Sequence, residues 1–341
     1  MGIQIDRIDT PTAPESVLRD LADYYEVVEA EERPGDPPTP HAMQYAHWRN
    51  LLPHQPVKRW VVRDAGRVVA AAVAAYDLQQ NLENGFGRLH VHPEHRGRGH
   101  ARRLAEQLFD ELEGAGRIRI DTYIKNDAPA EDLAARLGMK AVYGEKRSRL
   151  RIEDLDHDLM REWMERAAER GSNYRIEYFQ SPLPDDMIEQ FCELTLVMNT
   201  APREDFEEED EVLTPQMWRD MERSAADSEN QIHVIIAIHE PTGDYAGYTV
   251  MNTQGLQPDL AWQWDTGVHP EHRNKGLGRW IKAAMIEKVV SDYPELSRVD
   301  TYNAGSNESM LNINTAMGFR QVLLTRVWQG ELATARKRFG V

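Results

Sequence analysis

Blocks of apolar and polar residues predict an ordered series of short strands and amphipathic helices in the first half of the chain. The clearest helix has apolar residues at three-four spacing and ends at Gly114-Ala115-Gly116. Its apolar face consists of Ala101, Leu104, Ala105, Leu108, Phe109 and Leu112. The series predicted around it comprises strands at 58–64, 67–76 and 86–91, that helix, a strand at 117–124, a helix at 131–138 and a strand at 146–152.

The second half of the chain repeats this series. The predicted elements are a strand at 174–179, a helix at 187–197, a hairpin of strands at 231–239 and 244–253, a strand at 260–268, a helix after residue 276, a strand at 297–303, a helix at 307–318 and a strand at 321–328. The helix after residue 276 carries Leu277, Ile281, Ala284, Met285 and Val289 on one face. The two halves therefore predict the same fold twice.

Identical sequence segments mark the same places in both halves. The six residues VHPEHR occur at 91–96 and again at 268–273. About thirty residues later each half has the tripeptide DTY, at 121–123 and at 300–302, and then a helix closed by Gly138-Met139 or Gly318-Phe319. This ordered recurrence indicates a duplicated unit.

The length of 341 residues fits two domains of ordinary size. We expect an N-terminal domain at 1–152, a connecting helix at 153–171 that packs on both units, and a C-terminal domain at 172–341. The fold class predicted is α/β (α+β). The composition favours a globular chain without a membrane span, and the N-terminus shows no signal peptide, so we expect a cytoplasmic protein, a monomer or homodimer.

The net charge of −17 argues against a nucleic-acid partner and favours a cationic one. Acidic residues are densest at 203–211, which reads either as a solvated loop or as a field of carboxylates that attracts an amine. His90, His92 and His95 invite a metal site, but no carboxylate or cysteine completes one at a known spacing, so we expect no metal.

A glycine-containing turn follows each VHPEHR segment and carries the pattern R-x-x-G-x-G/A between a strand and a helix. Small residues there let the backbone approach a bulky anion, and the free N–H groups of a helix start suit a diphosphate. Basic side chains nearby add positive charge. The cofactor-binding residues predicted in the first half are Val91, Arg96, Gly97, Arg98, Gly99, His100, Ala101 and Arg102. Those predicted in the second half are Val268, Arg273, Asn274, Lys275, Gly276, Leu277, Gly278, Arg279, Asn303 and Asn307.

With these motifs in this order, each half resembles the GNAT superfamily of acyl-CoA-dependent N-acetyltransferases, over nearly the whole chain. The tandem arrangement also resembles mycothiol synthase and related actinobacterial acetyltransferases. The resemblance implies a curved mixed sheet flanked by helices in each unit, with the turn holding the diphosphate of acetyl-CoA or another acyl-CoA. It also implies that the backbone at Val91 or Val268 pairs with the pantetheine arm as an added strand.

Many members of this family have a tyrosine seven residues after an asparagine and four before the closing glycine, where it protonates the departing thiolate. The second half has Asn307, Asn314 and Gly318 at these positions, and the first has Asp127, Ala134 and Gly138. Neither half keeps the tyrosine. Because the second half retains Asn303, Asn307 and the Gly-Phe ending, we expect catalysis there, with Asn314 near the thiol sulfur.

A base is also expected, since a lysine-like amine loses its proton only near pH 10.4. The candidates are Asp265, on the strand that leads to the turn, and Glu211, at the end of the acidic run. The function predicted is transfer of an acetyl group from acetyl-CoA to the amine of a small cationic molecule. The alternative left open is a CoA-binding sensor or scaffold without catalysis.

Overall fold

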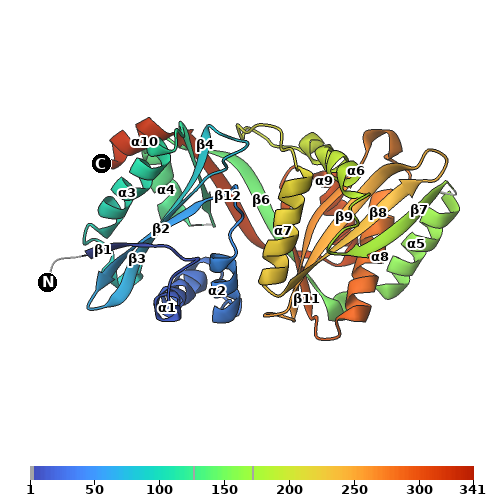
Figure 1. Cartoon of the computed structure of the whole chain (residues 1–341), viewed down its shortest axis with the longest axis horizontal. Coiled ribbons are helices and arrows are strands. Elements are labelled where there is room, and N and C mark those ends of the chain that lie inside the picture. The colour runs from blue at the N-terminus through green and yellow to red at the C-terminus, as the bar shows by residue number, and fades with distance from the viewer. Residues whose placement is uncertain (1–3, 126, 171–172) are drawn as a thin grey trace. The chain divides into compact units, whose positions relative to one another are not determined.

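The computed structural model describes residues 4–125, 127–170 and 173–341. The chain divides into two compact units (Figure 1). Unit 1 consists of residues 1–144, 204–209 and 323–341, and unit 2 of residues 145–203 and 210–322. Across the described ranges, no helix combines the length and the apolar character that a membrane crossing requires.

Unit 1 is a six-stranded sheet in the order β1-β2-β3-β4-β5-β12. Its strands are β1 (Gln4–Ile8), β2 (Val57–Asp64), β3 (Arg67–Ala75), β4 (Asn84–Val91), β5 (Arg119–Ile124) and the end of β12 (Arg320–Glu331). Its helices are α1 (Glu15–Glu32), α2 (His41–Arg49), α3 (His100–Gly114), α4 (Ala128–Arg136) and α10 (Leu332–Phe339). Leu18 and Trp48, of α1 and α2, pack with Val61 of one face, and Leu104 of α3 packs with Val62 of the other.

Unit 2 has the matching order β7-β8-β9-β10-β11-β6. Its strands are β7 (Tyr174–Gln180), β8 (Asn230–His239), β9 (Asp244–Gln254), β10 (Leu260–Val268), β11 (Arg298–Ala304) and the second half of β6 (Lys140–Arg151). The helices α6 (Ile188–Thr195) and α7 (Pro215–Asp227) cover one face. The other face is covered by α5 (His157–Arg170), α8 (Leu277–Asp292) and α9 (Glu308–Met317).

The predicted domain boundaries at 152 and 172 differ from these compact units, because the last strands are exchanged. Residues 145–151 of β6 pair with β11 of unit 2, whereas residues 326–331 of β12 pair with β5 of unit 1. The sequence pattern predicted both strands but not their partners. The predicted connecting helix corresponds to α5, which lies wholly in unit 2 and packs on α8 through Met160 and Ala167.

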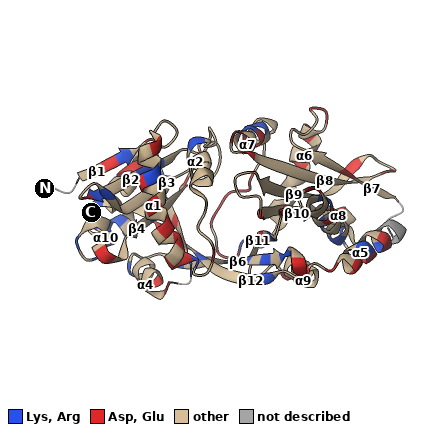
Figure 2. Cartoon of the chain, turned by 90° about the horizontal axis from the view of Figure 1, so that it is seen from below, with Lys and Arg blue, Asp and Glu red and all other residues tan. Residues whose placement is uncertain are grey.

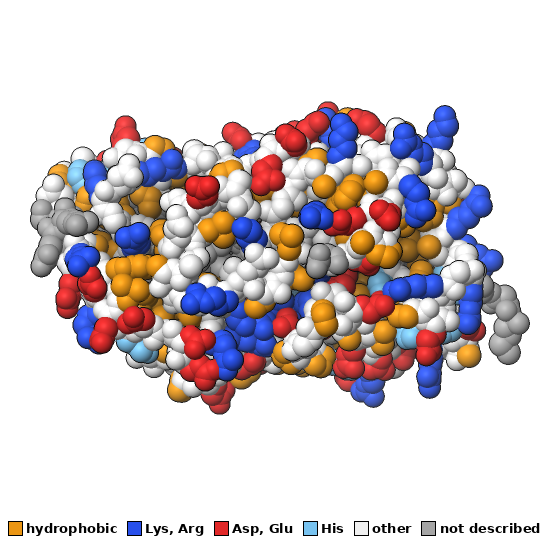
Figure 3. Space-filling view, turned by 180° about the vertical axis from the view of Figure 1, so that it is seen from behind, with side chains coloured by type: hydrophobic (Ala, Val, Ile, Leu, Met, Phe, Trp, Pro, Cys, Tyr) orange, Lys and Arg blue, Asp and Glu red, His pale blue; other side chains and the backbone are white. Residues whose placement is uncertain are grey.

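Charged side chains are spread over both units. Figure 2 shows acidic and basic residues alternating along α5. On the face drawn in Figure 3, acidic and basic side chains are interspersed rather than segregated by sign. The negative net charge is therefore not gathered on that face.

Candidate active site

The two R-x-x-G-x-G/A turns have the same backbone geometry. Gly97 and Gly99 have φ angles of 76° and 81°, and Asn274 and Gly276 have φ angles of 64° and 84°. In each turn, two residues with positive φ angles are separated by one residue. This arrangement turns successive N–H groups toward one side and forms an anion-binding concavity. Gly99 and Gly276 are the N-caps of α3 and α8, and within the described residues no side chain caps either helix. The first N–H groups of both helices are therefore available to an anion.

Small side chains keep the second turn open. A Cβ atom on Gly276 would meet nothing within 4 Å, so the positive φ rather than space selects glycine there. At Gly278 the nearest atoms would be those of Val268 and Ile313, at 3.7 and 3.8 Å, an ordinary contact distance. Ala101 occupies the matching position of the first turn, which agrees with this tolerance.

Several basic residues predicted to surround the anion contact the protein itself. The Nε atoms of Arg96 and Arg273 donate to the carbonyl oxygens of Val91 and Val268, both at 3.1 Å. The remaining contacts are Arg98 to the Glu94 carbonyl (3.0 Å), Arg102 to the Gly340 carbonyl (2.5 Å), Lys275 to the Tyr174 hydroxyl (2.7 Å) and Arg279 over the Trp163 ring (5.2 Å). Two predicted residues, His100 and Leu277, are buried at the helix starts. These side chains hold the turns in place, and the backbone is left to face the anion.

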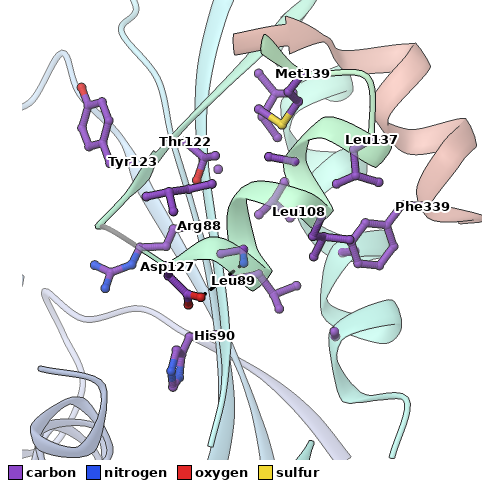
Figure 4. A pocket seen from close by; sticks show the side chains of 18 of the residues that line it. Arg88, Leu89, His90, Leu108, Thr122, Tyr123, Asp127, Leu137, Met139 and Phe339 are labelled. Atoms are coloured by element: carbon purple, nitrogen blue, oxygen red, sulfur yellow. Dashed lines mark hydrogen bonds between the residues drawn. The ribbon is translucent and has the colours of Figure 1, made fainter. Parts of the chain in front are cut away.

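The strands beside each turn separate. The parallel ladder between β4 and β5 covers Asn84–Phe86, and that between β10 and β11 covers Leu260–Gln263. Val91 and Val268 lie beyond the point of separation. In unit 1 the gap opens into a largely apolar cavity of about 230 Å³ (Figure 4). It is lined by side chains of β4, β5, α3 and α4, by Glu31 and Glu32 of α1, and by Phe339.

These features coincide with a family match. The sequence model of the acetyltransferase (GNAT) family matches residues 17–139 and 194–319, one segment in each half of the chain. The chain belongs to the GNAT family. This finding confirms the predicted family and the tandem arrangement, while the finer resemblance to mycothiol synthase stays a prediction. GNAT proteins generally use acetyl-CoA, and a glycine turn with free N–H groups beside an apolar slot fits that molecule.

Solved structures confirm the fold. A tandem GNAT protein from the clavulanic acid biosynthesis pathway superposes with a TM-score of 0.78 at 23% identity, over 97% of this chain and 99% of that one. A GCN5-related N-acetyltransferase from Sphaerobacter thermophilus gives 0.69 at 14% identity, over 96% of both chains. A putative acetyltransferase from Pyrococcus horikoshii gives 0.56 at 12% identity, over 97% and 90%. A comparison with curated proteins gave no match.

Strand β10 of the second GNAT unit contains a bulge that β4 lacks. Gln263 pairs with Met251 but Thr266 pairs with Thr249, so Trp264 and Asp265 together face a single residue of β9. The register between β3 and β4 is unbroken, and β4 is one residue shorter. A bulge redirects side chains and backbone groups locally, and bulges are frequent at active sites.

The bulge places Asp265 near two other polar residues. Burial, and then the Glu211 carboxylate, raise the pKa of Asp265 to about 6. The side chain is nevertheless exposed to solvent, so water reaches it while nearby protein atoms weaken its hydration. Burial, Asp265 and Glu211 together raise the pKa of Tyr248, whose hydroxyl lacks a hydrogen-bond partner among the described residues.

The loop that carries Glu211 is held by Asn199. The Asn199 side chain donates to the Glu211 carbonyl at 2.8 Å and accepts from the Glu211 N–H at 2.9 Å. The preceding residues of the acidic run belong to unit 1, where Glu207 and Glu209 bond with Gln329 and Asn81. The run is therefore an anchored loop, and Glu211 is its exposed carboxylate near Asp265.

The first GNAT unit carries an ion network where the second has Asp265. Arg88 stands three residues before Val91, as Asp265 does before Val268. Glu32 of α1 pairs with Arg88 and, at 2.7 Å, with Lys125. His90 is bonded at 2.7 Å to Glu31 and at 2.8 Å to the hydroxyl of Tyr24. A cation and its partners therefore occupy the place of the candidate base.

The asparagines of the second unit have separate roles. Asn307 caps α9 by accepting from the Met310 N–H at 3.2 Å, as Asp127 caps α4. Asn314 is buried and donates to Asn303 Oδ1 at 2.7 Å, while its own Oδ1 lacks a partner among the described residues. Asn307 thus acts as a helix cap in the structure, and Asn314 presents an unpaired amide oxygen.

The sequence identifies the repeated DTY segment as a marker of duplication but does not predict its structural role. Its aspartates are buried on β5 and β11, each next to the last strand of its sheet. Asp300 pairs with Arg147 and Arg149 of β6, whereas Asp121 is bonded to Gln329 of β12. Each aspartate fastens the last strand of its unit, and the repeat itself was the signal that could have revealed this role.

Proposed function

We propose that the chain is an acyl-CoA-dependent N-acyltransferase whose second unit transfers the acyl group to the amine of a small cationic molecule. The observation that carries the proposal is the combination, in unit 2, of an open R-x-x-G-x-G turn with a bulged strand that bears Asp265. Unit 1 has the same turn and an apolar slot, but Arg88 replaces the candidate base. We therefore assign acyl-CoA binding without transfer to unit 1.

In this proposal Asp265 accepts a proton from the acceptor ammonium, directly or through water. Removal of that proton at neutral pH costs about 4 to 5 kcal/mol for an amine near pKa 10.4, so a base with a pKa near 6 is well suited. Glu211 attracts the cation. Bound acyl-CoA supplies the activated thioester carbonyl.

The amine nitrogen attacks that carbonyl, the carbon–sulfur bond breaks, and CoA leaves as the thiolate. Backbone N–H groups of the bulged strand near Val268 polarise the carbonyl oxygen. Asn314 has no acidic proton to give, so water or the proton released by the amine neutralises the thiolate. Its amide oxygen and Asn303 shape the slot near the sulfur.

The test measures free thiol released from acetyl-CoA with a panel of di- and polyamines, for the native chain and for Asp265→Asn. We expect the substitution to lower kcat/KM by about 10²- to 10⁴-fold, the usual contribution of a general base. The native rate should rise with pH through about 6, since Asp265 must be deprotonated. Glu211→Gln should move that rise to lower pH.

The matched control is Asp227→Asn, an exposed carboxylate at the end of α7 in the same unit. It should leave the rate unchanged. Tight binding of acetyl-CoA with no thiol release for any amine would instead support the alternative, a CoA-binding sensor or scaffold.

A further inference from the structure

A lysine is buried in unit 2 without a counter-ion. Lys282 of α8 is 1% exposed, and among the described residues it forms neither a hydrogen bond nor an ion pair. The Nζ atom of Lys282 lies over the ring of Phe319, 5.9 Å from its centroid. Lysine is almost never fully buried unless it is paired, so this position calls for a partner that the protein does not supply.

The duplicated sequence locates Lys282 relative to the acyl-CoA slot. Lys282 stands nine residues after Arg273, and Ala105 stands nine residues after Arg96. Ala105 lines the cavity of unit 1, together with Ala134 and Met139. The counterparts of those two residues, counted from the closing glycine, are Asn314 and Phe319. Lys282 therefore occupies in unit 2 the position that lines the cavity in unit 1, where unit 1 has a methyl group.

A second polar atom at these matched positions also lacks a partner. Asn314 Oδ1 is buried and accepts no hydrogen bond within the described residues, while Asn314 Nδ2 is used by Asn303. Around them, Gly278 of α8 lies close to Val268 of β10 and Ile313 of α9. Lys282 and Asn314 thus lie on α8 and α9, two helices that approach each other and β10 at Gly278.

We propose that Lys282 binds a carboxylate at the far end of the acyl group, so that unit 2 accepts CoA thioesters of dicarboxylic acids. The inference rests on the proposed function, and it names the acyl donor. The phosphates of CoA bind at the turn, outside the slot. The acyl group is therefore the part of the donor that can carry a negative charge into the slot. Pairing with a carboxylate removes the penalty of a lone buried charge.

The protonation of Lys282 gives this proposal a measurable signature. Burial alone lowers the pKa of Lys282 to about 7, with no contribution from a charged group of the elements packed around it. A bound carboxylate stabilises the ammonium form and raises that pKa again. Above pH 7 the free protein holds mostly the neutral amine, so binding must take up a proton.

The experiment is calorimetry at about pH 8 with succinyl-CoA, butyryl-CoA and free succinate, in buffers of different ionisation enthalpy. The native chain should bind succinyl-CoA about tenfold more tightly than K282M does, which at pH 8 corresponds to a rise of about two units in the pKa of Lys282, with proton uptake. K282M should lose both the excess affinity and the proton uptake. Its binding of butyryl-CoA should be unchanged or tighter.

Lys288→Met is the matched control, because Lys288 lies on the same helix, is half-exposed and pairs with Asp292. It removes one positive charge outside the slot and should leave the preference unchanged. Thermal unfolding of K282M at or above the native temperature would show that the variant folds, as expected when a lone buried amine is replaced by an apolar chain.

Equal effects of K282M on succinyl-CoA and butyryl-CoA would overturn the proposal, and so would tight binding of free succinate alone. Binding does not require turnover, so the two proposals fail separately. A chain that binds succinyl-CoA through Lys282 but transfers nothing refutes only the transferase. A chain that transfers acetyl groups but binds succinyl-CoA no more tightly than K282M does refutes only the role of Lys282.

Discussion

At the residue scale, one backbone angle selects the residue type at the centre of each turn. Gly276 and Gly99 adopt left-handed φ angles of 84° and 81° although a side chain would have room. Gly278 lies only two residues after Gly276 in the same turn, but it has no such angle and tolerates a Cβ. The three glycines therefore make different contributions, which the spacing R-x-x-G-x-G/A does not reveal.

We expect Gly276→Ala to cost about 1 kcal/mol of stability, since an L-residue is strained at that angle, and to weaken acyl-CoA binding to unit 2 by misaligning the N–H groups. Gly278→Ala should be nearly neutral, because alanine occupies that position in the first turn. Thermal unfolding and titration with CoA measure both effects. Equal loss in the two variants would contradict this account of the turn.

The turns and the candidate bases could be located from the sequence, because glycine spacing and charged residues are visible within a short segment. The environment of a side chain could not. Lys282 reads as one more polar position of an amphipathic helix, and only packing against Phe319 shows that it is buried. Arg96 and Arg273 are predicted to face an anion. In the structure Arg96 binds the Val91 carbonyl and Glu31, and Arg273 binds the Val268 carbonyl and Thr200.

At the element scale, β5 and β11 bear the same DTY segment but fasten different partners. Asp300 neutralises two arginines of β6, while Asp121 is hydrogen-bonded to the neutral amide of Gln329 in β12. Burial raises the pKa of Asp121 to about 7, because the hydrogen bond from Gln329 offsets only part of the effect of burial. One repeated residue therefore has opposite electrostatic consequences in the two sheets.

We expect Asp121→Asn to stabilise the protein at about pH 8 by up to roughly 4 kcal/mol, the upper limit for a pKa shift of about three units. The folded state holds a proton on Asp121 up to about pH 7 that the unfolded chain loses near pH 4. The free energy of unfolding should therefore fall between those values in the native chain, and this fall should be smaller in the variant. Urea denaturation across that range measures it.

Asp300→Asn is the counterpart in the other unit. It should destabilise the protein by about 3 to 5 kcal/mol, because two arginines would lose their buried counter-ion. A similar response of both variants would show that the two aspartates share one environment.

At the scale of the whole molecule, each unit is built from more than one segment of the chain. Helical and strand periodicity predicted the strands and helices of the repeated series but missed β1, α1, α2, α7 and α10. The repeat predicted two copies of one fold. The exchange of β6 and β12 was not predicted, because either strand offers the same alternating pattern to either sheet. Only the register of Asp300 with Arg149, and of Asp121 with Gln329, distinguishes the two pairings.

The exchange predicts that the end of the chain stabilises unit 1. Leu332 of α10 is 1% exposed and packs in the core of unit 1. Leu332→Ala should cost about 2 to 5 kcal/mol and should increase hydrogen exchange in β4 and β5. Val322→Ala, at a position 46% exposed, should change stability by less than about 0.5 kcal/mol. Increased exchange confined to unit 2 would contradict the assignment of these strands.

The shared strands also bear on the order in which the protein is made. A ribosome releases the first GNAT unit early, yet that unit lacks its closing strand and last helix until residues 323–341 have been translated. The second unit, whose borrowed strand of residues 145–151 is already synthesised, can close as soon as residue 322 emerges. The half that is translated first is therefore the half that is finished last.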